Sequence, residues 1–411
     1  MFLNKRVLMV LSLVLSFLMM LALTACAFKE DKSESEYEAA GDYYDEPSEA
    51  GAHARTTSSG SSRDGGQMPD EEYVGGDAFV LTAGEWNDNE NWPFFSNLVT
   101  SGTITFPSYG IDPRGRIKLT LTDETGAPLE GETASLSGAD GVLWTAKTDR
   151  NGIAYLFFGE GETPETVSAL DQTVTLSYEA PSGDTQQSAS SPASDEVSIT
   201  GAAQAAKKTS LQVMFIVDTT GSMGDEIAFL QKDFAAIASD AGSNGVEYSA
   251  CFYRDEGDEY VTKVNGFTSD LGEVSALIMA EYADGGGDLP EAVAQILDET
   301  ITENTAWNDD ARKIAFLIFD APPHSQYDAV IDKAVRAAAE KGIMVVPVVA
   351  SNADRDTELF GRALAICTNG TYVFLTDDSG VGESHLEPIV GDYTVELLHD
   401  IIVRIINENK I

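Results

Sequence analysis

Residues whose side chains could bind a metal ion stand at three places in the second half of the chain. Asp218 is followed at alternate positions by Thr220 and Ser222, so one short segment supplies a carboxylate and two hydroxyls. Asp288 follows three consecutive glycines, and Asp320 follows a run of apolar residues. Carboxylate and hydroxyl oxygens are the ligands that hard cations such as Mg²⁺ and Mn²⁺ prefer. These five residues are therefore predicted to bind a divalent cation.

Apolar and amphipathic segments alternate around these residues and predict where they lie in the fold. The apolar runs 211–217 and 313–319 end just before Asp218 and Asp320, respectively. Apolar strands separated by amphipathic helices indicate an α/β fold with a doubly wound, mostly parallel sheet covered on both faces. Ligands of such sheets bind at the carboxyl ends of the strands, where these two acids stand. Further strands are predicted at 246–253, 260–267, 343–349 and 371–375, and helices at 225–241, 271–282, 291–300, 327–341, 358–366 and 395–406.

The three loops that carry these acids resemble those of a known family. The first loop, Asp218-Thr219-Thr220-Gly221-Ser222-Met223, is similar to the metal-ion-dependent adhesion site (MIDAS) of von Willebrand factor A (vWA) domains. Residues 285–291 (GGGDLPE) and 320–324 (DAPPH) resemble the second and third loops of bacterial and hemicentin-like members. The resemblance covers about residues 208–411 and implies the Rossmann-like vWA fold for that range.

The resemblance also implies a role for each predicted ligand. Asp218, Thr220 and Ser222 would bind the ion from the first loop, and Asp320 belongs to the third loop. Asp288 occupies the loop in which integrin α-type domains supply a threonine. In the family, a partner protein completes such a site with an acidic side chain. Three carboxylates around one divalent ion leave a net negative charge, so we expect constitutive metal binding and a weak or selective contact with an acidic partner.

A hydrolase is the alternative that the same loop suggests. Residues 220–224 come near the G-x-S-x-G pattern of the α/β-hydrolase nucleophile, and Asp320 and His385 follow Ser222 in the corresponding order. The first glycine of that pattern is a threonine here, and a catalytic triad gives no role to Asp218. We therefore expect a binding protein and not an enzyme, with a serine hydrolase that uses Ser222 as a remote alternative.

Charge and composition limit the classes of partner. The 411 residues include 25 Lys and Arg against 68 Asp and Glu, which gives a net charge of −43. A field of this sign repels the phosphate backbone, so no nucleic-acid partner is expected. The hydrophobic content of 43% is ordinary for a folded protein.

The remaining reactive residues are given structural roles. His324 and His399, like the other histidines, lack the paired spacing of a zinc site. The charged residues 254–259 resemble a segment of bacterial vWA domains and are expected to form a surface cluster, with a place beside the ligand site as the alternative. Cys251 and Cys367 are expected to be buried free thiols, because the strands near them should lie on opposite sides of the first strand.

The N-terminus has the layout of a secretory signal. Two basic residues at 5 and 6 precede the uncharged stretch 7–23. A membrane-spanning anchor would show a similar stretch, but Leu23-Thr24-Ala25-Cys26 resembles the lipobox of bacterial lipoproteins. That resemblance implies a signal peptide over 1–25 and lipidation of Cys26. The protein is then expected to be secreted and anchored through its lipid to the outer side of a bacterial cell membrane, in the cell envelope.

Two regions separate this anchor from the vWA domain predicted for 208–411. Residues 26–78 are acidic and poor in aliphatic side chains, which predicts a disordered tether. Residues 79–200 show strand-like alternation and turn residues, which predict an Ig-like β-sandwich that acts as a spacer. A hairpin is predicted around the turn 148–152, and residues 81–86 are expected to pack along the edge of this sandwich.

These observations predict a cell-envelope lipoprotein whose vWA domain binds a divalent cation, Mg²⁺ before Mn²⁺, and mediates protein–protein interaction or adhesion. The alternative is a structural envelope protein in which the metal only stabilises the fold. Replacement of Ser222 distinguishes the two functions. It should abolish binding of the partner in the first case and lower thermal stability in the second.

Overall fold

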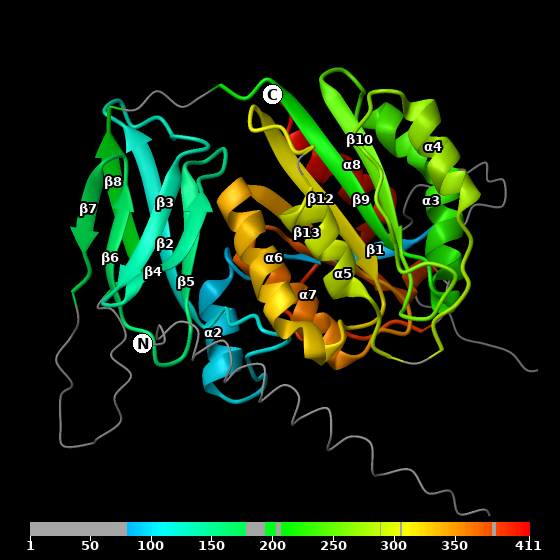
Figure 1. Ribbon diagram of the computed structural model, residues 1–411, viewed down its shortest axis with the longest axis horizontal. Coiled ribbons are helices and arrows are strands. Elements are labelled where there is room, and N and C mark those ends of the chain that lie inside the picture. The colour runs from blue at the N-terminus through cyan, green and yellow to red at the C-terminus, as the bar shows by residue number, and fades with distance from the viewer. Residues whose placement is uncertain (1–79, 178–193, 203–206, 288, 305, 380–383) are drawn as a thin grey trace, which may run out of the picture. The chain divides into compact units, whose positions relative to one another are not determined.

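The computed structural model describes residues 80–177, 194–202, 207–287, 289–304, 306–379 and 384–411 (Figure 1). They all belong to one compact unit that runs from Val74 to Ile411. The predicted signal peptide, Cys26 and the predicted tether lie outside the described residues, and so does Asp288. A search of the described helices finds none with the length and apolar character needed to cross a membrane.

In the described part of the chain, eight strands form one large sheet with the order β11-β10-β9-β12-β13-β14-β1-β15. The five inner strands from β10 to β14 are parallel, whereas β11, β1 and β15 pair antiparallel with their neighbours. This arrangement confirms the predicted α/β fold with a largely parallel sheet. The strands are β1 Thr82–Trp86, β9 Ser210–Asp218, β10 Val246–Tyr253, β11 Thr262–Lys263, β12 Ala311–Phe319, β13 Ile343–Val349, β14 Tyr372–Thr376 and β15 Glu396–Leu397.

Helices cover both faces of this sheet because its strands are apolar on both faces (Figure 1). The helices are α3 Gly224–Asp240, α4 Leu271–Ala280, α5 Val293–Leu297, α6 Asp328–Lys341, α7 Arg355–Cys367 and α8 Leu398–Glu408. In β9, Val213 and Phe215 pack into one core with α3, α4 and α8. Met214 and Ile216 point the other way and pack into the core of α5, α6 and α7. Each such side chain contributes about 1.5 to 3 kcal/mol by leaving water.

Some elements are shorter than their sequence pattern predicts. Of the strand predicted at 260–267, only β11 pairs in the ladder, because the Asn265 side chain donates to the carbonyl of Ala250 and the Asn265 carbonyl accepts from the Ser249 hydroxyl. The helix predicted at 291–300 is divided into α5 and a π-helical turn, Asp298–Thr302. The helix predicted at 395–406 starts only at Leu398, because the two preceding residues form β15.

Strand β1 corrects the predicted domain boundary at residue 79. Thr82 to Trp86 pair with β14, from Thr82 opposite Thr376 to Trp86 opposite Tyr372. Gly84 lies against the Phe374 ring, where an added Cβ would be 2.4 Å from a ring carbon. Residues 82–86 therefore belong to the large sheet, although the sequence analysis placed them at the edge of the predicted sandwich. The large sheet takes one strand from a segment that precedes the whole of the second β region.

The second β region, here called the two-sheet region, contains two smaller sheets. A sheet with the order β5-β2-β8 packs against one with the order β4-β3-β6-β7. Ile117, Leu119 and Leu121 of β2 are fully buried, as their alternation predicts. The Ig-like character of the region stays a prediction. Its strands are β2 Gly115–Asp123, β3 Thr133–Gly138, β4 Gly141–Lys147, β5 Ile153–Phe158, β6 Pro164–Ala169, β7 Gln172–Thr175 and β8 Glu196–Gly201.

The hairpin predicted around residues 148–152 is wrong in its pairing. The turn itself forms, and Gly152 has the positive φ of 72° that the prediction required. However, β4 and β5 on either side of the turn belong to different sheets. The Trp144 and Phe157 rings meet edge to face across the space between these sheets, with their centroids 5.2 Å apart. Alternating apolar residues thus predicted the strands correctly, but not which strands pair.

The two-sheet region shares its hydrophobic core with one face of the large sheet. The buried residues of the two-sheet region and those of α5, α6 and α7 form one continuous cluster. The connecting helix α2 (Trp92–Thr100) contributes Phe95 to it. Arg362 of α7 donates two hydrogen bonds of 2.8 Å to the Asp88 carboxylate, and both side chains are fully buried. These contacts bind residues 88–100 to the large-sheet side of the structure.

A histidine between two carboxylates gives this fold a pH-dependent contact. His399 of α8 lies 2.6 Å from Asp233 and 3.2 Å from Asp240, both on α3. Burial lowers the pKa of His399, but the hydrogen bonds to these carboxylates outweigh it, and the pKa is raised above 6.5. Both ring nitrogens must carry a proton to donate to both acids. Protonation of His399 therefore strengthens the packing of α8 on α3.

We expect the His399→Gln variant to be less stable than the wild type by about 0.5 to 1 kcal/mol at pH 5 and equally stable at pH 9. A raised pKa stabilises the fold fully below the pKa of the unfolded chain, and this contribution is lost as the pH rises through the folded-state pKa. Urea unfolding at pH 5, 7 and 9 would measure it, with Asp240→Asn as the matched variant. A stability difference that grew with pH would contradict the assignment.

Candidate metal site

The first predicted loop follows directly from the end of β9. Asp218 is the last residue of the strand, and the loop passes through a short 3₁₀ turn, Gly221–Met223, into α3. One carboxylate oxygen of Asp218, Oδ1, accepts hydrogen bonds from the Thr220 amide at 2.9 Å and the Thr220 hydroxyl at 2.7 Å. The Thr220 and Ser222 hydroxyls are 3.4 Å apart. The structure thus brings the three oxygen-bearing side chains of this loop together.

The third loop meets the first because β9 and β12 are neighbouring parallel strands. Val217 pairs with Ile318, so the ends of the two strands lie side by side. Asp320 follows β12 and accepts a hydrogen bond from the Ser222 side chain. The structure therefore brings four of the predicted residues together at one edge of the sheet, as predicted: Asp218, Thr220, Ser222 and Asp320.

Two carboxylate oxygens at this edge are buried without a hydrogen-bond partner. They are Oδ2 of Asp218 and Oδ1 of Asp320. Burial, followed by the charge of Asp320, raises the pKa of Asp218. Burial also raises the pKa of Asp320, against the hydrogen bond from Ser222. Buried carboxylates are normally paired, so these two oxygens identify a place where positive charge would be strongly favourable.

The donor set at this edge fits a hard divalent cation. It offers carboxylate and hydroxyl oxygens, which suit Mg²⁺ or Mn²⁺ better than a soft metal. Within the described residues, no three His, Cys, Asp or Glu side chains come together as a metal-binding group. The described part of the site therefore combines two acids with the hydroxyls of Thr220 and Ser222. Asp288, predicted as the third acid, lies outside the described residues.

The glycines before Asp288 let the second loop pack directly on the first. Gly285, Gly286 and Gly287 all have positive φ, which costs other residues energy. A Cβ added to Gly286 would lie 2.9 Å from a Glu291 carboxylate oxygen and 3.1 Å from the Cβ of Thr220. The Gly221 amide also donates to the carbonyl of Gly285 at 3.2 Å. Close approach of the two backbones explains why this segment consists of glycines.

Glu291 is an acid of the site that sequence reasoning missed. Its side chain is almost completely buried, and Oε2 has no hydrogen-bond partner. Burial, and then the charges of Asp218, Asp255, Asp320 and Asp258, raise the pKa of Glu291 to about 9. The Glu291 amide donates to the carbonyl of Pro322 at 3.0 Å and ties the second loop to the third. Its position at the end of the GGGDLPE segment was the signal, but that segment alone does not indicate burial.

The predicted surface cluster at 254–259 is wrong for its first two residues. The Arg254 side chain is buried, lies over the rings of Tyr260 and Tyr282, and donates to the Tyr282 carbonyl at 2.8 Å. Asp255 is also buried and lies 2.7 Å from Nε2 of His324. A charged side chain can be buried where aromatic rings and carbonyls replace water, which residue type alone does not show.

The residues of the alternative catalytic triad do not assemble in the structure. His385 contacts Asp377 at 2.8 Å and the Ser351 hydroxyl at 3.3 Å, whereas Ser222 donates to Asp320. Ser351 is itself buried, and its hydroxyl donates to Glu226 at 2.7 Å. Neither His385 nor another histidine with a described contact is therefore placed to act as the general base for Ser222.

Comparison with known proteins identifies the domain that carries this site. Residues 212–382 match the family model of the von Willebrand factor A domain. The match includes β9, β12 and all three loops described above. The chain therefore contains a vWA domain, a type of domain that often mediates protein–protein interaction or adhesion.

Individual relatives are more distant. An ariadne-like RING finger protein of Acanthamoeba polyphaga mimivirus is 26% identical over 211 residues, which are 46% of this chain and 20% of that protein. The chain thus spans about a fifth of the length of this curated relative.

Two solved structures are similar at low scores. A vWA structure from Catenulispora acidiphila has 15% identity and a TM-score of 0.34. The match covers 49% of this chain and 43% of the Catenulispora chain. BatB from Bacteroides thetaiotaomicron, a conserved hypothetical protein, has 15% identity and a TM-score of 0.32. The match covers 42% of this chain and 91% of the BatB chain. No inference about this chain is drawn from structural similarity at these scores.

Proposed function

We propose that this vWA domain binds one divalent cation, Mg²⁺ or Mn²⁺, and that the bound ion mediates contact with a partner protein. Asp218, Thr220, Ser222 and Asp320 would hold the ion, with Asp288 as a further ligand. The observation that supports this proposal most directly is the pair of buried, unpartnered oxygens on Asp218 and Asp320. A cation between these acids would replace two costly desolvated charges by two favourable contacts.

The chemistry of the site also indicates what kind of partner it would take. A divalent ion held by few protein oxygens keeps waters, and an acidic side chain of a partner can displace one of them. The whole chain carries a net charge of −43. A field of this sign disfavours an approaching anion, so the contact would be selective and would depend strongly on the ion.

The N-terminal sequence supports a place for this activity in the cell. The lipobox-like residues 23–26 follow an uncharged stretch, which supports lipidation of Cys26 and anchoring to the outer side of a bacterial membrane. The acidic residues 26–78 would then act as the tether between the membrane and the folded region. The protein would be a cell-envelope lipoprotein that presents its metal site to proteins outside the membrane.

Calorimetric titration of Mg²⁺ and Mn²⁺ into the full chain tests the metal site. We expect the wild type to bind one ion and the Ser222→Ala variant to bind it more than about tenfold more weakly, because a ligand oxygen is lost. Ser239 is exposed on the same helix that follows the loop, so Ser239→Ala is the matched control and should bind as the wild type does. Equal affinity of the wild type and Ser222→Ala would disprove the proposed ligand set.

A structural role for the metal is the second candidate, because neutralising buried carboxylates would also stabilise the fold. A short peptide with one glutamate, titrated with and without Mg²⁺, separates the two functions. Mg²⁺-dependent binding that Ser222→Ala removes would support a partner site. A rise in melting temperature with Mg²⁺, without peptide binding, would support the structural function instead.

A further inference from the structure

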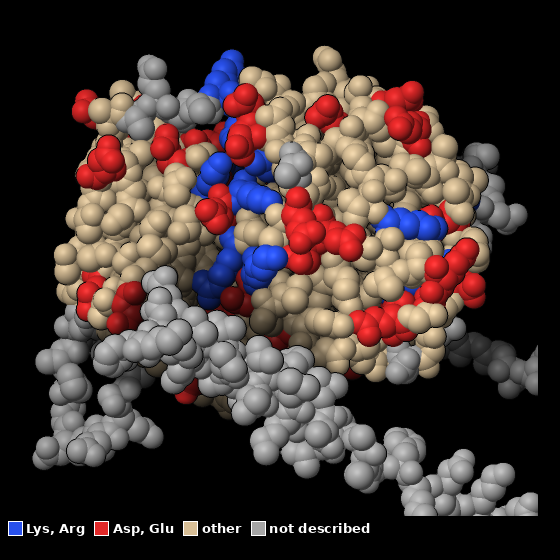
Figure 2. All heavy atoms as spheres, in the orientation of Figure 1, with Lys and Arg blue, Asp and Glu red and all other residues tan. Residues whose placement is uncertain are grey.

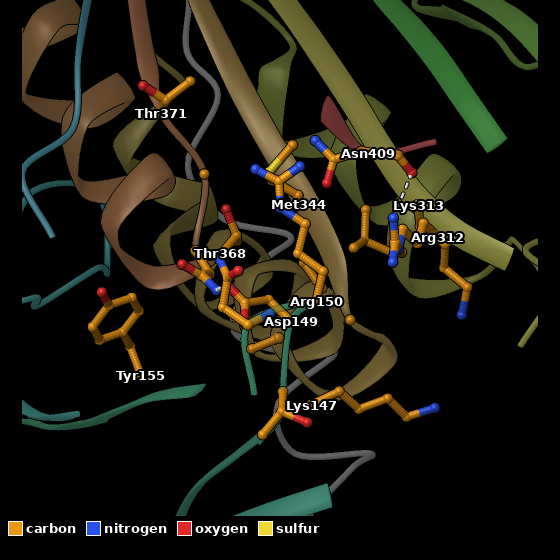
Figure 3. Close-up of a pocket in the computed structure, with 18 of the residues that line it drawn as sticks. Lys147, Asp149, Arg150, Tyr155, Arg312, Lys313, Met344, Thr368, Thr371 and Asn409 are labelled. Atoms are coloured by element: carbon orange, nitrogen blue, oxygen red, sulfur yellow. Dashed lines mark hydrogen bonds between the residues drawn. The ribbon is translucent and has the colours of Figure 1, made fainter. Parts of the chain in front are cut away.

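Lys and Arg side chains form a band on one face of this strongly acidic protein. Figure 2 shows them as a band along the boundary between the two-sheet region and the strands of the large sheet. A cavity of about 560 Å³ lies at this boundary and is lined by seven Lys or Arg and five Asp or Glu residues. Figure 3 shows that Lys147 enters the cavity from the two-sheet region, whereas Arg312 and Lys313 enter from β12.

Three lysines of this cavity converge on a single aspartate. Nζ of Lys313 lies 3.1 Å from Oδ1 of Asp309, and Nζ of Lys147 lies 3.7 Å from the same oxygen. Nζ of Lys208 donates to the backbone carbonyl of Asp309 at 2.6 Å. The three ammonium groups come from β4, from the segment just before β9, and from β12. We call these three residues the lysine cluster.

The lysine cluster has more ammonium groups than carboxylates in contact with it. Lys147 and Lys313 contact the Asp309 carboxylate, whose side chain is 83% exposed, whereas Lys208 contacts only the backbone carbonyl of Asp309. Burial lowers the pKa of Lys208, and the charge of Lys147 lowers it further. Burial also lowers the pKa of Lys313, and the charges of Lys147 and Lys208 add to this effect. The charges of Glu130, Asp309 and Asp310 act on Lys208 in the opposite direction. In direct contacts, the cluster has three ammonium groups and one carboxylate at the mouth of a cavity.

The arginines of the same cavity differ from the lysine cluster because each contacts its own carboxylate. Arg312 pairs with Glu130 through two hydrogen bonds of 2.7 and 2.9 Å. Arg404 lies 2.7 Å from Glu85, and Arg150 lies 3.3 Å from Glu408. The arginine contacts tie the parts of the structure together, whereas the lysine cluster has more ammonium groups than contacting carboxylates.

The lysine cluster is held in place by its surroundings. Lys313 is 96% buried, since only 4% of its surface is exposed, and it also donates to the carbonyl of Lys341 at 3.0 Å. A Cβ added to Gly342 would lie 3.2 Å from the Cβ of Lys147, so the glycine leaves space for this side chain. Lys208 lies beside Gly131, where an added Cβ would be in ordinary contact with its Cε at 3.4 Å. A buried, ordered lysine loses little freedom when it binds a ligand.

We propose that the lysine cluster binds a small phosphoryl-bearing anion with at least two negative charges. Each ammonium group acts as a point charge with three donors. Such groups suit the tetrahedral oxygens of a phosphoryl group better than they suit a planar carboxylate. The excess of ammonium groups over contacting carboxylates matches such an anion, and the exposed Asp309 side chain can turn away from it. The cavity has room for a ligand larger than phosphate itself.

Titration of inorganic pyrophosphate into the full chain, in metal-free buffer and low salt, tests this proposal. The buffer is freed of metal with a chelating resin, because soluble polycarboxylate chelators would compete as anions and a bound cation would attract pyrophosphate to the vWA loops. We expect saturable binding, weaker binding of inorganic phosphate, and the weakest binding of glycerophosphoglycerol, a singly charged diester that stands for a lipid headgroup. Diester binding as tight as that of pyrophosphate would overturn the requirement for a multiply charged ligand.

Four variants, one of them a control, make the test specific to the lysine cluster. Lys147→Gln and Lys208→Gln should each weaken pyrophosphate binding by about tenfold, and Lys118→Gln, in the same two-sheet region, should leave it unchanged. Asp309→Asn should tighten binding severalfold, because it removes the competing carboxylate, and a misfolded variant could not produce that gain. Undetectable binding by the wild type, or equal binding by the wild type and all four variants, would overturn the proposal. None of these results depends on whether the vWA loops bind metal.

Discussion

Replacing Asp218 by asparagine is expected to abolish divalent-cation binding and, at the same time, to make the metal-free protein more stable. Asp218 is fully buried beside Asp320, and one oxygen of each carboxylate has no hydrogen-bond partner. Without an ion, this arrangement places two buried acids close together, which is costly. An amide at position 218 removes one charge and can donate a hydrogen bond to Asp320.

The two effects have different expected sizes and are measured separately. Loss of a charged ligand should weaken Mg²⁺ binding more than about hundredfold, which calorimetry would show. The free energy of unfolding of the metal-free variant should exceed that of the metal-free wild type by about 1 to 2 kcal/mol in urea. Asp233→Asn, on α3 and away from the loops, is a control that keeps metal binding. A variant that lost both metal binding and stability would show that Asp218 only supports the fold.

The sequence predicted that the proposed ligands meet at one edge of the sheet, because their chemistry and their place in the fold are local properties. Asp218 and Asp320 each follow an apolar strand, and the ends of neighbouring parallel strands meet at one edge. Glu291 was missed for the opposite reason. A glutamate in a polar, glycine-rich turn is normally exposed, and only the packing of three loops buries this one. Burial of a charge is a property of the assembled site and cannot be read from one segment.

The fold was predictable to the extent that it follows from periodicity. The buried strands and amphipathic helices of the vWA region were found near their predicted positions, because 2-residue and 3.6-residue patterns reflect burial directly. Strand pairing was less predictable. Thr82 and Thr376 are 294 residues apart in sequence, and no local pattern shows that their strands pair. The same limitation explains why β4 and β5 were predicted as a hairpin although they lie in different sheets.

A fragment of residues 208–411, which corresponds to the vWA domain predicted from sequence, is expected to be strongly destabilised. It lacks β1, so β14 would lose its antiparallel partner and β15 its only described one. Leu81 and Ala83 are buried in the core with α8, and their removal would leave apolar surface open to water. The fragment also lacks Asp88, so Arg362 loses one of its two ion-pair partners and keeps only Glu358.

Thermal unfolding of the fragment beside the full chain would measure this effect, with a midpoint expected to fall by more than about 10 °C. Adding a synthetic peptide of residues 80–90 tests whether β1 is the cause, because the peptide supplies both the strand and Asp88. The midpoint should rise with peptide concentration, as it does for any ligand that binds only the folded state. The same peptide with Ala83→Asp would place a charge in the core and should have no effect. Equal midpoints for the fragment and the full chain would mean that the sheet is stable without β1, and metal titrations could then use the isolated vWA domain.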